Sequence, residues 1–302
     1  AEEREGWVRL GFTIDTAGET KDIVVLDYVG SQLMVRAARL AVKRWTYKPA
    51  TEQGLPVEQY ANSAEILFRD KRIGNAAVHD AVVVKFDEGR ALIAEGKYAE
   101  GIKVLEQSFE QPLTLFERAR LSFALAYAYE RSKDMPRALA HIRHALIEGG
   151  KFLEKPVQPA AQRLRLRVEV ATGNFHFAAC AAPLPESDKF DPTGADRKET
   201  VKVVEEALTM LASPEPLTVR AALIANAAGD EGGMWEHPLS RRKFKFAALV
   251  GQIQEYRLNC VRQVSSGAVD VTTQVSVPPS AGACVLRVYG EVGAGFRVIE
   301  DW

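Results

Sequence analysis

The sequence predicts an α+β protein of several domains: a β-β-α-β domain, a region of helical repeats and a C-terminal antiparallel β-sandwich. Three observations lead to this prediction. Apolar and polar residues alternate on both sides of an amphipathic helix near the N-terminus, apolar residues recur at helical spacing in the middle of the chain, and short alternating segments follow from residue 217. The predicted boundaries are 1–72, 73–182, a linker at 183–198, and 199–302.

The N-terminal domain is predicted from two strands, a helix and a third strand. Residues 7–14 and 20–29 alternate around a turn at Ala17-Gly18, which is typical of a hairpin. Ser31 can cap a helix that ends near Trp45, since Pro49 prevents its continuation. Residues 57–68 then alternate again. The apolar sets are Trp7, Leu10, Phe12 and Ile14 in the first strand, Leu33, Met34, Ala37, Ala38, Leu40, Ala41 and Trp45 in the helix, and Tyr60, Ala64, Ile66 and Phe68 in the last strand.

Several motifs in this region occur in a familiar order. They are the run Gly6–Ile14, the turn glycine Gly18, W-x-Y-x-P-A from Trp45 to Ala50, and G-x-P-V from Gly54 to Val57. In this order the segment resembles the C-terminal domain of TonB-family proteins, over roughly a fifth of the chain. The resemblance implies a periplasmic location. The first residues, AEEREG, would fit either a secretory signal or an inner-membrane anchor upstream of Ala1.

The resemblance also implies a mode of partner binding. A TonB C-terminal domain takes an extended segment of an outer-membrane receptor as an added strand, so the last strand would offer its edge. The partner-binding residues expected there are Val57, Tyr60, Asn62, Ala64, Ile66 and Phe68. The same edge could instead pair with a second copy of the chain, which would give a homodimer.

The middle region contains two related segments, at residues 86–109 and 121–146. In each, a helix with a small residue (Gly89; Ala126) is followed by a turn and a second helix that opens with another small residue (Gly101; Ala138). The spacing resembles tetratricopeptide repeats, and residues 160–181 resemble a degraded third copy. An unrelated bundle of helical hairpins is the alternative.

Repeats of this kind would place one helix of each pair along a concave groove. The residues expected in the groove are Arg90, Arg120, Tyr127, Arg163 and Arg167. Guanidinium groups pair with carboxylates, so the groove would suit an acidic peptide or a free carboxylate. The alternative is that these arginines form an ordinary solvated face.

The C-terminal region contains six short segments that alternate as strands do: residues 217–225, 242–249, 252–260, 269–277, 284–291 and 296–301. They suggest a small sandwich or a partly open barrel. Cys260 and Cys284 could form a disulfide if their strands are neighbours, and the compartment implied by the resemblance would preserve it. A pair of buried thiols is the alternative, and Cys180 is expected to be free and buried.

The remaining sequence features do not favour an enzyme. A net charge of -1 offers no basic surface for nucleic acid, and no run of apolar residues is long enough to span a membrane. Gly149–Lys151 lacks the other residues of a phosphate loop, and His176 with Cys180 lacks further metal ligands, so neither a cofactor nor a metal is expected. The sequence therefore predicts a periplasmic protein-binding module that supports TonB-type transport. The alternative is a soluble periplasmic scaffold without energy transduction.

Overall fold

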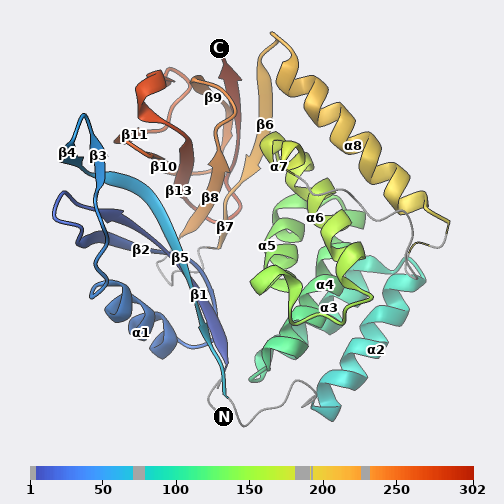
Figure 1. Cartoon of the computed structure of the whole chain (residues 1–302). Coiled ribbons are helices and arrows are strands. Elements are labelled where there is room, and N and C mark those ends of the chain that lie inside the picture. The colour runs from blue at the N-terminus through green and yellow to red at the C-terminus, as the bar shows by residue number, and fades with distance from the viewer. Residues whose placement is uncertain (1–4, 71–78, 181–190, 192, 226–231) are drawn as a thin grey trace. The chain divides into compact units, whose positions relative to one another are not determined.

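The computed structural model of the protein describes residues 5–70, 79–180, 191, 193–225 and 232–302 (Figure 1). The chain divides into two compact units. The helical unit contains Glu5 and Arg69–Ala212, and the β unit contains Gly6–Phe68 and Ser213–Trp302. The N-terminal and C-terminal β regions, which the sequence suggested as separate domains, therefore belong to one unit.

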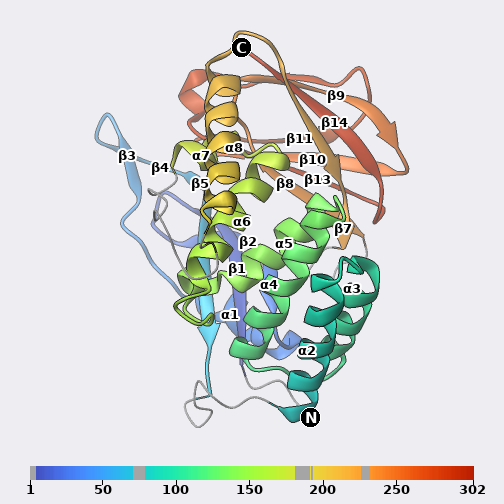
Figure 2. The same ribbon diagram turned by 90° about the vertical axis from the view of Figure 1, so that its right-hand side faces the viewer.

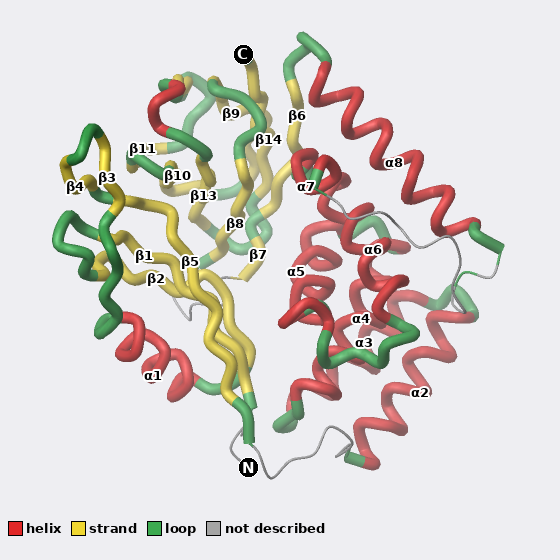
Figure 3. The backbone as a smooth tube through the Cα atoms, viewed as in Figure 1, coloured by secondary structure: helices red, strands yellow, loops and turns green. Residues whose placement is uncertain are grey.

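The N-terminal part of the β unit has the predicted β-β-α-β order. Strands β1 (Gly6–Ile14) and β2 (Thr20–Val29) form a hairpin, helix α1 (Gln32–Val42) follows, and β5 (Gln59–Phe68) completes an antiparallel three-stranded sheet in the order β2-β1-β5 (Figure 3). A small hairpin of β3 (Ala50–Glu52) and β4 (Leu55–Val57) precedes β5. Val57, predicted in the last strand, instead pairs with Ala50 in this hairpin.

The core of this sheet lies between β1 and α1. Val8, Leu10, Phe12 and Ile14 are buried against Val35, Ala38 and Val42, because alternate residues of a strand point to the same face. Trp7 was predicted on this face. Because side chains alternate along β1, Trp7 lies on the face opposite to Val8 and Leu10, where its indole Nε1 donates to Glu65 Oε2 at 3.1 Å.

The buried side of α1 also differs from the prediction. Leu33, Ala37, Leu40 and Ala41 are exposed, and the core-facing positions are Val35, Ala38 and Val42, with Met34 and Trp45 partly buried beside them. Apolar residues occupy nearly all directions around this helix, so their spacing alone did not distinguish the side that faces the sheet.

The helical unit consists of consecutive antiparallel helices (Figure 2). Three pairs pack closely: α2 (Asp80–Ala94) with α3 (Tyr98–Glu106), α4 (Leu115–Arg131) with α5 (Met135–Ala145), and α6 (Gln158–Ala171) with the short α7 (Phe175–Ala179). Short 3-10 helices span Gln107–Glu110 and Ile147–Gly150.

The first pair crosses where both helices carry glycine. A Cβ atom on Gly101 would lie 2.7 Å from Ile93 Cγ1 and 2.9 Å from the carbonyl oxygen of Gly89. A Cβ on Gly89 would lie 2.6 Å from Leu105 Cγ. Larger side chains would therefore force the two helices apart.

The predicted linker at 183–198 ends earlier than expected. Residues 181–190 and 192 lie outside the described residues, but Ala195–Ala212 forms helix α8, which packs on α6 and α7. Residues 199–212, assigned from sequence to the C-terminal β region, thus belong to the helical unit.

The C-terminal part of the β unit contains two antiparallel sheets, in the orders β11-β10-β13-β8-β7 and β12-β9-β14-β6. Aromatic side chains join them: Tyr256 packs on Phe244 and Phe246, and Trp235 packs on Phe296. The sheets are antiparallel, as the sequence predicted, and we refer to this pair of sheets as the sandwich. The strands are β6 (Leu217–Ala222), β7 (Ile224–Ala225), β8 (Gly233–Pro238), β9 (Lys243–Val250), β10 (Ile253–Cys260), β11 (Val264–Ala268), β12 (Gln274–Ser276), β13 (Cys284–Gly290) and β14 (Gly295–Asp301), with a 3-10 turn at Pro279–Ala281.

Two features of the sandwich differ from the sequence prediction. Strands β8 and β11 were not predicted, and most of the predicted strand 269–277 lies outside regular structure. Asp270 explains the second difference, because its carboxylate accepts from the backbone N–H of Thr272 at 2.6 Å and holds a local turn.

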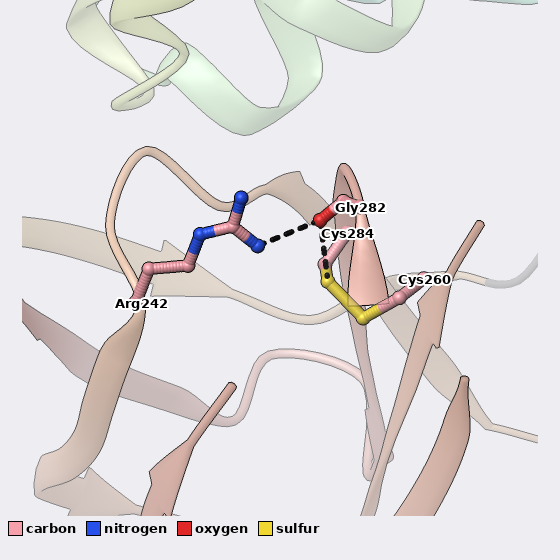
Figure 4. The surroundings of a disulfide bond; sticks show 4 residues. All are labelled: Arg242, Cys260, Gly282 and Cys284. Carbon is pink, nitrogen blue, oxygen red and sulfur yellow. Dashed lines mark hydrogen bonds between the residues drawn. A yellow bond between two sulfur atoms is a disulfide. The ribbon is translucent and has the colours of Figure 1, made fainter. Parts of the chain in front are cut away.

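Cys260 and Cys284 form the predicted disulfide (Figure 4). They lie directly opposite each other on the neighbouring strands β10 and β13. Beside them, Arg242 Nη1 donates to the carbonyl oxygen of Gly282 at 2.7 Å. Cys180 carries a free thiol, as expected, but its side chain is exposed rather than buried.

Candidate functional site

The outer edge of β5 is the first candidate site. In the sheet order β2-β1-β5, this strand has β1 on one side, and β1 pairs with it from Gly6↔Phe68 to Ile14↔Gln59. On its other side, the N–H of Tyr60 donates to the carbonyl oxygen of Val261 at 3.0 Å. Val261 directly follows β10, so a loop of the sandwich already contacts the beginning of this edge.

A β-bulge separates the two parts of the edge. The register with β1 shifts between Phe12 and Ile14, and Ala61 takes a positive φ of 56°. Beyond the bulge, Asn62–Phe68 continues as regular strand paired with β1. Within the part of the chain that the structure describes, no strand is paired to the outer side of Asn62–Phe68.

The predicted partner-binding side chains of β5 are engaged inside the domain. Ala64, Ile66 and Phe68 pack against the core beneath α1. Asn62 Nδ2 donates to the carbonyl oxygen of Gln59 at 2.6 Å, and Tyr60 Oη donates to Glu58 Oε2 at 2.6 Å. This hydrogen bond raises the pKa of the Tyr60 hydroxyl. The outer edge therefore offers main-chain groups, while most of the predicted side chains point elsewhere.

The other face of the sheet is attached to the sandwich by an ion-pair bridge. Glu236 on β8 accepts from Arg9 Nη2 at 3.0 Å and from Arg287 Nε at 2.9 Å. The side chains of Glu236 and Arg287 are nearly buried, so the bridge is partly shielded from solvent. Together with the Tyr60–Val261 bond, it fixes the three-stranded sheet within the β unit.

A groove in the helical unit is the second candidate site. It has a volume of about 950 Å³ and is lined by residues of α2, α4, α6 and α8, by the first residue of α3 and by the segment before α6. Four of the five predicted groove residues line it: Arg90, Arg120, Tyr127 and Arg167. The fifth, Arg163, is only 1% exposed and does not line the groove.

One wall of the groove combines arginines with aromatic rings. The guanidinium carbons of Arg120 and Arg90 lie 4.6 Å and 5.9 Å from the centre of the Phe86 ring. Arg131 lies 5.8 Å from the Tyr127 ring. Arg120 also pairs with Glu154 at 3.4 Å. Stacked guanidinium groups keep their hydrogen-bond donors available at the edges, so this wall can receive an anionic group.

Arg167 lies deeper and is paired within the protein. Its Nε donates to Glu130 Oε1 at 2.7 Å, and its Nη1 contacts Asp196 and, at 3.1 Å, Thr200 Oγ1. Burial disfavours the charge of Arg167, but the two carboxylates outweigh this and raise the pKa of its guanidinium. Arg163 pairs with the same Asp196. Both arginines therefore hold α8 against α6 and are not open to a ligand.

Acidic residues also line the groove, and the sequence analysis did not find them. Asp196 and Glu199 lie on the first turns of α8 and line the groove. They were missed because the prediction placed Asp196 in a linker and Glu199 in the C-terminal β region. The signal that could have identified the helix is its i,i+4 charge pattern, seen in the structure as the contact of Lys202 with Glu206 at 3.8 Å.

The comparisons with known proteins concern the first candidate site. Residues 1–69 match the family model described as Gram-negative bacterial TonB protein C-terminal. The β2-β1-β5 sheet and α1 are thus a TonB C-terminal-like domain. No curated protein matches the chain.

The strand β5 belongs to this TonB C-terminal-like domain. Such a domain suggests a TonB-like role and the Gram-negative envelope, and TonB-like domains bind protein partners. Across the described ranges, none of the helices is both long and apolar enough to cross a membrane, and no three His, Cys, Asp or Glu residues gather as a metal site would require.

Proposed function

We propose that this chain binds proteins in the envelope of a Gram-negative bacterium, in the periplasm, and supports TonB-type transport across the outer membrane. In this proposal an extended segment of an outer-membrane receptor, or of another envelope protein, adds as a strand to β5 of the TonB C-terminal-like domain. The chain contributes binding rather than catalysis.

The position of β5 carries this proposal. It is the outermost strand in the order β2-β1-β5, and Asn62–Phe68 pairs on its inner side with β1. Every second residue of an edge strand directs its N–H and C=O outward, so this stretch can form a ladder with an added strand. The bond between Tyr60 and Val261 limits the usable edge to the residues after the bulge at Ala61.

The inward direction of Ala64, Ile66 and Phe68 has a consequence for specificity. Main-chain hydrogen bonds would supply most of the affinity at β5 itself. Discrimination between partners would come from side chains on the face of the strand opposite α1, where Ser63 and Glu65 are exposed.

Paired proline substitutions test strand addition. Neighbouring residues of β5 direct their N–H groups to opposite sides, so one of Ser63→Pro and Ala64→Pro removes an outward donor and the other removes a bond to β1. We expect the variant that lacks an outward donor to remain folded and to lose binding of peptides from the N-terminal segments of outer-membrane receptors. Calorimetry measures this binding. The proposal is wrong if the variant that lacks an outward donor is folded and still binds such peptides as the unmodified chain does.

The helical unit supports a second candidate function, that of a periplasmic scaffold without energy transduction. We propose here that the three helix pairs are tetratricopeptide-like repeats and that their groove binds an acidic peptide. The observation that favours it is the arginine and aromatic wall formed by Phe86, Arg90 and Arg120. Its test is Arg90→Glu combined with Arg131→Glu, two exposed positions on this wall.

The two candidates give opposite results with the same peptides. If the groove is the binding site, the double glutamate variant loses affinity and the proline variants keep it. If β5 is the site, the pattern is reversed. A homodimer through β5 would be seen as a concentration-dependent mass that the outward proline variant abolishes.

A further inference from the structure

Helix α1 presents an apolar ridge to solvent on the side away from its own sheet. Leu33 and Leu40 are each 59% exposed, and Ala37 between them is exposed as well. The two leucines are seven residues apart, which places them on one side of the helix about 10.5 Å from each other. The core-facing positions Val35 and Val42 lie on the other side, so packing of the domain does not use this ridge.

Basic residues flank the ridge. Arg36, Arg39, Lys43 and Arg44 are all exposed. No acidic residue occurs between Asp27 and Glu52, although the whole chain has a net charge of -1. The positive charge is therefore concentrated on α1 and next to it, with no acidic neighbour in the same stretch of sequence to compensate it.

The charge pattern decides between possible occupants. A second copy docking through the same ridge would bring the four basic residues of each chain together, and this like-charge contact is unfavourable. A small anion would need a concave site, but these side chains radiate from a convex helix. An anionic surface that is both broad and able to receive leucine side chains matches the charge and the ridge together.

We propose that α1 docks the TonB C-terminal-like domain on an anionic lipid bilayer. Leu33 and Leu40 enter the boundary between headgroups and acyl chains, and Arg36, Arg39, Lys43 and Arg44 lie at the level of the lipid phosphates. The helix lies along the surface and does not cross the bilayer. The outer edge of β5 belongs to the sheet and not to this ridge, so membrane docking goes beyond the proposed protein binding and does not depend on it.

Vesicle co-sedimentation of the full chain tests the proposal. The probes are vesicles of phosphatidylglycerol mixed with phosphatidylcholine, and vesicles of phosphatidylcholine alone. We expect the chain to sediment with the first and not with the second, and to be released by high salt, because salt screens charges at the surface.

Three variants separate the contributions. Leu33→Ser with Leu40→Ser should reduce the fraction bound at least tenfold, since the insertion of apolar groups is lost. Arg36→Gln with Lys43→Gln should weaken binding by roughly fivefold for each charge removed. Val250→Ser is the matched control, because Val250 is 68% exposed but lies on the sandwich. Circular dichroism verifies that all three remain folded.

The outcomes that overturn the proposal are distinct. The absence of sedimentation with phosphatidylglycerol vesicles contradicts it, and so does a double serine variant that sediments as the unmodified chain does. A concentration-dependent dimer abolished by Leu33→Ser with Leu40→Ser, in the absence of vesicle binding, would assign the ridge to a second copy. Retained binding to receptor peptides in the same variants would show that the β5 proposal stands separately.

Discussion

The helical unit joins its helices through ion pairs in its interior, whereas the two sheets of the sandwich meet mainly through aromatic contacts. In the helical unit, Arg167 bonds to Glu130 and Asp196, and Glu169 bonds to Arg143. In the sandwich of the β unit, the sheets meet through residues such as Phe246 and Phe296.

The β unit also has a buried polar centre at Glu300, and it is arranged differently from the ion pairs of the helical unit. Glu300 accepts from His237 Nε2 at 2.6 Å and from the backbone N–H groups of Ser240 and Arg241. Its partners are largely main chain, whereas the helical unit joins whole helices through side chains. The comparison teaches that buried ion pairs add to apolar packing between the helices, whereas aromatic side chains form the contact between the sandwich sheets.

The largest effect is expected from breaking the network at Arg167. Arg167→Ala leaves Glu130 without its buried partner, so the free energy of unfolding of the helical unit should fall by about 3–5 kcal/mol. Arg90→Ala, on the exposed groove wall, should change it by less than about 0.5 kcal/mol. Both changes in the free energy of unfolding can be measured by unfolding the chain in urea and monitoring each unit separately by hydrogen exchange. Equal effects of the two variants would contradict the role given to the buried ion pairs of Arg167.

Loss of the disulfide should act on the β unit instead. Cys260→Ser with Cys284→Ser frees a loop with a sequence separation of 24 residues. The expected loss of stability is about 3 kcal/mol, because the unfolded chain gains freedom. The control is Cys180→Ser at the exposed free thiol of the helical unit. A loss that appears in the helical unit and not in the β unit would contradict this account.

A smaller effect is expected from Trp45, which lies at the end of α1. Its ring centroid is 6.5 Å from that of Phe12, and the side chain is half-buried. Trp45→Ala should therefore cost about 2–3 kcal/mol, less than a fully buried tryptophan. Leu40→Ala, on the exposed ridge of the same helix, should be nearly neutral. If Leu40→Ala is the more damaging of the two in thermal unfolding, the two sides of α1 have been assigned wrongly.

The smallest effect is a difference in acid sensitivity. Burial favours the neutral form of Glu169, but Arg143, Asn174 and Arg165 outweigh it and hold its pKa below the usual value of 4.5. Because the folded pKa is the lower one, this contribution to stability is present above about pH 4.5 and is lost as the pH falls through the folded value.

The helical unit should therefore lose stability below that pH. The pKa of Asp270 in the β unit is also lowered, through hydrogen bonds from Thr272, but this carboxylate is exposed and solvent screens its contribution. Unfolding measured as a function of pH, with Glu169→Gln as control, should show a flatter profile for the variant. An unchanged acid profile would contradict the role given to Glu169.

The sequence predicted most strands of the β unit but not all of them. Alternation identified β1, β2, β5 and most strands of the sandwich, because one side of each strand is apolar and the other polar. Strand β8 was missed, since its Glu236 and His237 look like solvent-exposed residues and are instead paired inside the β unit.

For the candidate sites, the sequence identified the arginines of the groove but not which of them are buried by partners. Arg90, Arg120 and Arg167 line the groove, but Arg167 and the neighbouring Arg163 are buried by partners from α8 and α4. Those partners are distant in sequence, so spacing along one helix could not reveal them. Likewise, the contact of Val261 with Tyr60 joins two segments that are far apart in the sequence, so no local pattern indicates it.

A titration of the full chain with peptides from the N-terminal segments of outer-membrane receptors, followed by backbone amide shifts, tests strand addition most directly. The account predicts saturable shifts concentrated on Asn62–Phe68, with Tyr60 little changed because its N–H is already bonded to Val261. Shifts confined to the helices from Asp80 to Ala212 would contradict it and would assign partner binding to the groove.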